Sequence, residues 1–242
     1  MHQLKENFQV IYYAPINSLG VAMNLISFGY LQFKNNTKIK EIELLKRLCF
    51  GTKEFSKNDV NSALELFVSN NLIDSIRIII CFENYMKAEY FAQGYLIHRL
   101  NKEKFKDLAK EQNKRPVLLS EVLELSKWEI NSTLKTFKES TRYQIKGILT
   151  NTIGMKELLS VGYLTKINFP EDIANICKDY NTYRNNLHLY MEENMTLSEE
   201  SFYELTKLTD FVNNKIVSLH NTIVDKIGKG EQYKIETIKY FA

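Results

Sequence analysis

The sequence predicts an all-α protein. The chain has only 9 Gly and 3 Pro among its 242 residues, against an average usage of roughly 7% and 5%. Because sheet-rich folds need frequent turn residues, this scarcity favours long helices joined by few loops. Apolar residues also recur at helical spacing, for example over 39–48 and 202–219. We therefore expect a helical bundle with one very long central helix, and a short strand or extended arms at the termini.

Composition and charge are those of an ordinary soluble globular protein, with 44% hydrophobic and 25% charged residues. The formal net charge of +3 is too small to identify a nucleic-acid-binding protein by electrostatics alone. The three cysteines are widely spaced in apolar surroundings, which predicts reduced, buried thiols. The N-terminus does not resemble a signal peptide, and the apolar run 19–33 contains polar residues. We expect a cytoplasmic protein with no membrane span.

Residues 1–58 are predicted to form a helical and extended region that packs on a helical domain formed by 59–242. Within this region, 1–17 contains a short apolar run before a proline, which could be a strand or an extended arm. An apolar helix is expected over 18–35. The clearest early helix is 38–49, because it has an apolar stripe with charges between and a glycine just beyond its end.

The longest predicted helix spans about 72–111 and follows a shorter one that ends near Asn70. Interrupted only by Gly94, it would be about 60 Å long at 1.5 Å per residue. Its first part is apolar nearly all round and should be central to the core. Its last part, 102–114, is a charged face expected to be solvated.

One line of residues follows this predicted helix at spacings of three and four. Such a line on a buried helix is either an ion-paired structural seam or the wall of a site. For Lys87 and His98 a structural role is thus the alternative to a role in binding substrate. The members of the line are Glu83, Lys87, Tyr90, Gly94 and His98.

Four more helices are predicted in the second half of the chain. Pro116 precedes the first, whose Trp128 we interpret as a core or interface anchor. The last two, 171–193 and 197–227, begin with helix-start signals, and glycines stop the second before a tail that could be a strand or an arm. Between the first of the four helices and these last two, residues 131–150 should form a polar helix. Its basic stripe is either a solvated face or a phosphate contact, and consists of Lys135, Lys138, Arg142 and Lys146.

The helix 171–193 carries the strongest candidate for chemistry. Arg184 and His188 are four positions apart, so they should project from one face about 5–6 Å apart at Cβ. A fixed cation beside a group that titrates near neutrality suits phosphodiester chemistry. Asn185 adds an amide with two donors and an acceptor. The alternative is structural, with Arg184 at the surface and His188 half-buried.

Common cofactor and metal motifs are missing from the sequence. There is no glycine-rich phosphate loop, no nucleophile elbow, and no cluster of Cys or His at metal-ligand spacing. We therefore expect a site without a metal or an organic cofactor, and the Arg–His pair remains its best candidate.

Two segments together resemble the HEPN superfamily of all-helical domains. The first is 83–90, ENYMKAEY, continuing to His98, and the second is 183–189, YRNNLHL. The resemblance covers about residues 60–225 and includes the family's catalytic segment, in which an arginine and a polar residue precede a histidine. Three residues separate Arg184 from His188, which is fewer than the usual family spacing.

The resemblance implies a metal-independent endoribonuclease with a composite site at a homodimer interface. Arg184 would neutralise the transferring phosphoryl group, and His188 would be a general base or acid. Asn185 would orient the phosphate or the histidine, and Glu83 would pair with Arg184 or fix the tautomer of His188. The residues that would bind RNA substrate are Lys87, His98 and Tyr183.

The resemblance also implies a role in a bacterial toxin–antitoxin or antiphage defence system, with an antitoxin or another defence protein as partner. Cleavage would leave a 2′,3′-cyclic phosphate end. A second hypothesis is a catalytically inactive helical dimer that binds a nucleotide, RNA or a protein as a regulatory module. A third is a helical interaction protein that has no such site.

Overall fold

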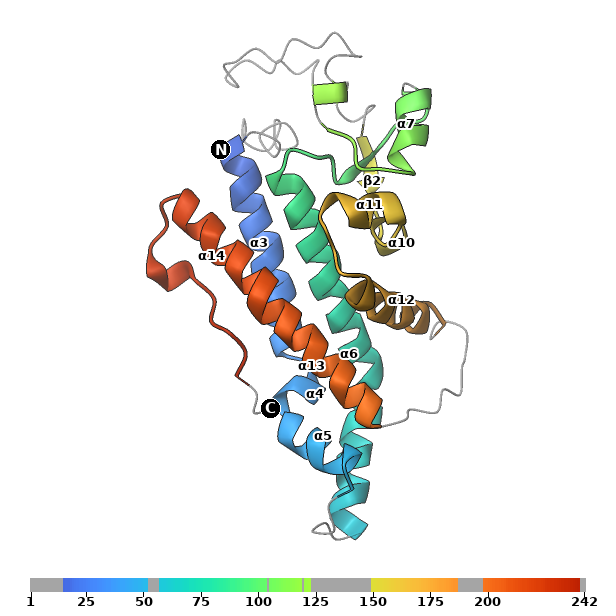
Figure 1. Cartoon of the computed structure of the whole chain (residues 1–242), viewed down its shortest axis with the longest axis vertical. Helices are drawn as coiled ribbons and strands as arrows, with labels where there is room; N and C mark the ends of the chain where they lie inside the picture. The colour runs from blue at the N-terminus through green and yellow to red at the C-terminus, as the bar shows by residue number, and fades with distance from the viewer. Residues whose placement is uncertain are drawn as a thin grey trace, which may run out of the picture. The chain divides into compact units, whose positions relative to one another are not determined.

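The computed structural model of the protein describes residues 15–51, 57–103, 105–118, 120–122, 149–186 and 198–239. Most of these residues are helical, which confirms the prediction of an all-α protein (Figure 1). Within these ranges, no helix is both long enough and apolar enough to cross a membrane. Trp128 and the basic stripe at 135–146 lie outside the described residues.

The chain divides into two compact units. The first unit consists of Met1–Leu25 and Met86–Phe169, and the second unit of Ile26–Tyr85 and Pro170–Ala242. Helices α3 (Pro15–Lys34) and α6 (Lys57–Ala92) contribute residues to both units. The division predicted from the sequence, 1–58 against 59–242, follows other boundaries and stays a prediction.

The second unit has an aromatic core between helices. Phe82 of α6 packs edge-on against Phe33 of α3, with ring centroids 6.2 Å apart, and also contacts Phe211, at 5.7 Å. Helix α3 passes close to α6 here, because a Cβ on Gly29 would lie 3.1 Å from the Cα of Cys81. The other helices of this unit are α4 (Thr37–Lys40), α5 (Ile42–Cys49), α12 (Glu171–Asn186), α13 (Glu199–Phe211) and α14 (Val217–Lys226).

The first unit contains a small sheet, which the all-helical expectation did not include at this position. Strand β1 (His98–Leu100) pairs antiparallel with β2 (Leu149–Thr152), and His98 lies opposite Thr152. The end of the predicted helix 131–150 is therefore a strand. Three short helices accompany the sheet: α7 (Lys106–Gln112), α10 (Met155–Leu158) and α11 (Val161–Lys166).

The predicted helix at 72–111 is wrong in its bounds. Helix α6 begins at Lys57, includes the shorter helix predicted before it, and ends at Ala92. Gly94 has φ +83°, and its backbone N–H donates to the carbonyl of Phe91. Because glycine adopts this left-handed conformation without steric cost, it ends the helix here. The chain then turns into β1, so His98 does not continue the helical line of Glu83 and Lys87.

Two asparagines hold the C-terminal tail of the second unit. The side chain of Asn221 both accepts from the backbone N–H of Ile235 and donates to its carbonyl, at 3.0 Å each. Asn213 binds Ile238 in the same way. Asn213 lies in the π-helical turn η3 (Val212–Ile216), which joins α13 to α14 and interrupts the single helix predicted over 197–227. Beyond the short turn η4 (Glu231–Tyr233), the tail is therefore an extended segment fixed to these helices.

Candidate functional site

Helix α12 (Glu171–Asn186) begins where the sequence predicted. Pro170 precedes it, and Glu171 and Asp172 occupy its first turn, where negative charge is favourable beside the positive end of the helix dipole. One face of the helix is buried in the core of the second unit. The buried residues are Ile173, Ala174, Ile176 and Cys177.

Contacts with α6 determine the direction of α12. Burial raises the pKa of the Cys177 thiol, and the nearby thiol of Cys81 raises it further. About three turns nearer the N-terminus of α6 than Cys81, the side chain of Asn71 donates a hydrogen bond to the hydroxyl of Tyr183. Partner positions on α6 fall as positions on α12 rise, so α12 passes from the level of Cys81 toward the level of Asn71. The last turn of α12 therefore lies at the level of residue 71.

This last turn carries Arg184, which is partly buried, and Asn185, which is exposed. Among the described residues, the Arg184 side chain has no ion-pair or hydrogen-bond partner. On the same face, three positions earlier, Oδ1 of Asn181 is buried and also has no partner within those ranges. An unpaired cation and an unpaired acceptor thus occur three positions apart on one face of α12. His188 is outside the described residues, and its pairing with Arg184 stays a prediction.

A chain of side-chain hydrogen bonds holds this end of α12. Nζ of Lys38 donates to Oδ1 of Asn71 at 3.0 Å, and Nδ2 of Asn71 donates to the Tyr183 hydroxyl. Burial lowers the pKa of Lys38, whereas the charges of Asp74, Cys49 and Glu204 act to raise it. Tyr183, one of the predicted substrate-binding residues, therefore anchors α12 to α6.

Asp74 is the buried anion beside this chain of hydrogen bonds, with its side chain only 1% exposed. Its carboxylate accepts from the backbone N–H of Thr37 at 3.0 Å and from Nη1 of Arg77 at 3.1 Å. Sequence reasoning missed Asp74, Asn71 and Lys38, because they meet only in the folded chain. The one available signal was a carboxylate within the mostly apolar segment 72–80.

The structure does not bring Glu83 beside Arg184. The last turn of α12 lies at Asn71, and twelve positions separate Asn71 from Glu83 along α6. At 1.5 Å per residue this is about 18 Å, which is beyond the combined reach of the two side chains. Glu83 is partly buried at the opposite end of the α6–α12 contact.

Lys87 and His98 lie together in the first unit. Lys87 is only 8% exposed, and its Nζ donates to the hydroxyl of Thr152 at 3.5 Å. Because Thr152 pairs with His98 across the sheet, strand β1 places His98 near Lys87 of α6. Burial lowers the pKa of His98, and the positive charge of Lys87 lowers it further. Lys87 and His98 therefore lie near each other and apart from Arg184 in sequence. The pairing of β1 with β2 brings them together, whereas the sequence had predicted that both lie on one helix.

Three carboxylates, those of Asp179, Glu200 and Glu204, lie near one another where α12 contacts α13. Burial raises the pKa of Glu204 on α13, and the negative charges of Glu200 and Asp179 raise it further. Lys207 and Lys38 act in the opposite direction, because their positive charges favour the ionised carboxylate. The electrostatic environment of α12 is thus mixed, with acids near its middle and Arg184 at its end.

Within the described ranges, no three His, Cys, Asp or Glu side chains are grouped as a metal site would require. Protein-family models, curated proteins and solved structures were compared with the chain, and none of them matches it. The interpretation of the site therefore depends on its own geometry and chemistry.

Proposed function

We propose that the protein is a metal-independent endoribonuclease of the HEPN type, which cleaves RNA at the C-terminal end of α12. The observation that supports this most is the Arg184 side chain, partly buried and without a carboxylate partner among the described residues. A structural arginine in such a position is normally paired, because an unpaired charge is costly to desolvate. Its planar fork is suited to bind the two oxygens of a phosphodiester.

The anchoring of α12 supports a role in positioning. The hydrogen bonds from Lys38 through Asn71 to Tyr183 fix the residue next to Arg184. Catalytic side chains act best when their helix is held before substrate binds, since orientation need not then be gained at the transition state. Asn185, exposed beside Arg184, supplies an amide that can orient the phosphate.

The proposed reaction is a transesterification within RNA. His188 removes the proton from a ribose 2′-hydroxyl, whose oxygen attacks the adjacent phosphorus. The bond from phosphorus to the 5′-oxygen breaks, and that oxygen takes up a proton from an imidazolium. The products are a 2′,3′-cyclic phosphate and a 5′-hydroxyl end. Arg184 stabilises the negative charge that develops on the phosphoryl oxygens.

The family resemblance supports two further parts of the proposal. The active form is a homodimer, in which two copies of the Arg184 helix end form one composite site. Its biological role is that of a toxin or an antiphage defence protein, restrained by an antitoxin or another partner. Expression of the wild-type chain, but not of His188→Ala, should then arrest bacterial growth.

The test is RNA cleavage by the purified full chain in EDTA. Arg184→Ala and His188→Ala should each lower the cleavage rate by about 100-fold or more, since each removes a group that acts at the transition state. Arg47→Ala is the matched control, because Arg47 is an exposed arginine in the last turn of α5 in the same unit. It should cleave like wild type.

Three outcomes decide between the hypotheses. Cyclic phosphate ends that disappear in both site variants but not in the control support the ribonuclease. Equal rates in the control and site variants would contradict it. RNA that is bound without cleavage by a folded dimer would favour the inactive binding module instead.

A further inference from the structure

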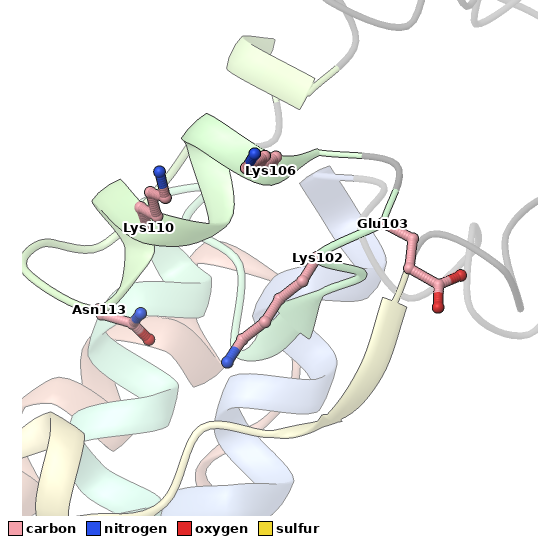
Figure 2. A pocket seen from close by; sticks show the side chains of 5 residues that line it. All are labelled: Lys102, Glu103, Lys106, Lys110 and Asn113. Atoms are coloured by element: carbon pink, nitrogen blue, oxygen red, sulfur yellow. The ribbon is translucent and has the colours of Figure 1, made fainter.

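A hollow with a volume of about 410 Å³ lies at α7 in the first unit (Figure 2). It is within the range of roughly 300–1,000 Å³ that is typical of small-ligand sites. None of its residues belongs to the α12 site or to the pair of Lys87 and His98. The lining residues are Lys102, Glu103, Lys106, Lys110 and Asn113.

Positive charge is concentrated in this part of the sequence. Residues 101–115 contain six basic and three acidic side chains, which gives a local net charge of +3. The whole chain also has a formal net charge of +3, so all other residues together are neutral. A protein with little overall charge thus has, in this segment, a local excess of positive charge that can attract anions.

The lysines of the hollow are not neutralised within the protein. Lys102 and Lys106 have no carboxylate partner among the described residues. Nζ of Lys110 is 4.0 Å from Asp107, but both side chains are exposed, and such pairs contribute little. Figure 2 shows that Lys102 extends toward Asn113 below α7, whereas the carboxylate of Glu103 points away from both. The ammonium groups therefore remain available to a ligand.

The frame around the hollow is held by buried contacts. Gln112, the last residue of α7, accepts from the backbone N–H of Leu100 and donates to the carbonyl of His98, both at 2.8 Å. Its own carbonyl accepts from the hydroxyl of Tyr163 at 2.7 Å. On the inner side of α7, Leu108 and Ala109 belong to the apolar core of this unit. A ligand would therefore meet a prearranged surface and lose less entropy on binding.

We propose that this hollow binds the phosphate groups of a nucleotide, either free or within a nucleic-acid strand. Lysine is a compact positive charge that binds phosphate without demanding one geometry. The lysine methylene groups can pack against the face of a base, while Asn113 offers amide donors and an acceptor to ribose or phosphate. The site is separate from α12 in sequence, and binding there does not require the proposed cleavage.

The test compares two triple variants of the full chain by isothermal titration calorimetry. In the first, Lys102, Lys106 and Lys110 are all changed to Gln. In the control, three exposed lysines of the second unit are changed to Gln, so that the net charge is lowered equally. They are Lys207, Lys215 and Lys226. The probes are ATP, adenosine and a short 2′-O-methyl RNA strand, which has no free 2′-hydroxyl for cleavage.

We expect ATP, the strand, or both to bind, and the first variant to weaken that binding by about tenfold or more. The control should stay within about twofold of wild type. For the strand, removal of three phosphate contacts should also lower the slope of log affinity against log salt by about 2. Binding of ATP indicates a free nucleotide, and binding of the strand alone indicates a nucleic acid.

The proposal is overturned if neither phosphate ligand binds, if adenosine binds as tightly as ATP, or if both triple variants lose affinity equally. Thermal unfolding of each variant shows whether it is folded. If the Lys→Gln variant of the hollow does not fold, single Lys102→Gln and Lys106→Gln variants replace it, and each should weaken binding of the same ligand. An uncleavable probe keeps this result independent of whether the protein is a ribonuclease.

Discussion

Lys38 and Lys102 show how differently the two units treat a positive charge. In the second unit, Lys38 is partly buried beside α6, and its ammonium group donates to Asn71. Burial lowers its pKa, and the charge of the buried Asp74 carboxylate acts in the opposite direction. In the first unit, Lys102 is exposed at the edge of a hollow and has no carboxylate partner among the described residues.

This difference separates charges that hold the fold from charges that can bind a ligand. A buried charge is stable only when fixed partners replace its lost hydration, and those partners leave it unavailable to other molecules. An exposed lysine keeps its hydration and can exchange it for a phosphate. Arg184 is intermediate, because it is partly buried and yet unpaired within the described ranges. That combination is the reason for proposing it as the active group.

The largest expected effect on stability comes from removing the buried carboxylate of Asp74. Asp74→Ala leaves the N–H of Thr37 and the nearby Lys38 without their anion, and should lower the free energy of unfolding by about 3 kcal/mol or more. The matched control is Asp107→Ala on α7, where the aspartate side chain is 97% exposed. It should leave stability unchanged. Urea unfolding followed by circular dichroism measures both, and equal effects would contradict the distinction between the two regions.

A smaller effect on stability is expected for a substitution at Gly162 of α11, which lies against the backbone of Lys114 just after α7. A Cβ on Gly162 would lie 1.8 Å from the carbonyl oxygen of Lys114, so Gly162→Ala must displace backbone. Overpacking of this kind costs about 1–3 kcal/mol, and it should also weaken phosphate binding at the hollow. The same change at Gly20 of α3, which has nothing within 4 Å, should raise stability by up to about 1 kcal/mol. Thermal unfolding compares the two, and a stable Gly162→Ala variant would show that the approach is not rigid.

The smallest effect is a difference in pH dependence between two glutamates. Burial and neighbouring acids raise the pKa of Glu204, so its contribution to stability is present at low pH and lost as pH rises above the ordinary glutamate range. The hydrogen bond from Arg115 lowers the pKa of Glu121 in the first unit, so its contribution is present at neutral pH and lost as pH falls.

Substitution of each glutamate by glutamine should therefore give opposite slopes. Relative to wild type, Glu204→Gln should gain stability as pH rises above about 4, and Glu121→Gln should lose stability as pH rises through the acidic range below about 5, because the folded-state pKa of Glu121 lies below the ordinary glutamate value. Urea midpoints at several pH values measure the two differences. Parallel slopes would contradict the assigned environments.

Local signals were sufficient for several elements. Pro170 and the acids after it predicted the start of α12, and Gly228, with φ +69°, ends the last helix as expected. The placement of Tyr183, Arg184 and Asn185 on α12 was also predicted, whereas the predicted end near residue 193 lies outside the described residues. In each case the decisive residues are neighbours in the chain, and their backbone preferences act without distant partners.

Other features depend on residues that are far apart in the chain. Gly94 ended α6 although the surrounding pattern favoured continuation, because β1 then pairs with β2 about fifty positions later. Asn71 and Tyr183 are separated by 112 positions, and no local pattern indicates that they bond. The same holds for the π-helical turn whose Asn213 fixes the tail.

The sequence by itself therefore determined the helical class, the start of α12 and the chemical identity of the residues on its last turn. Only the tertiary structure decided that Lys38 and Tyr183 are bound to Asn71, that Lys87 meets His98 across a strand, and that three lysines surround a hollow at α7. The physical reason is the distance along the chain over which each feature is determined. Helix starts and stops follow from backbone preferences of adjacent residues, whereas the partner and exposure of a charge depend on which distant segments pack around it.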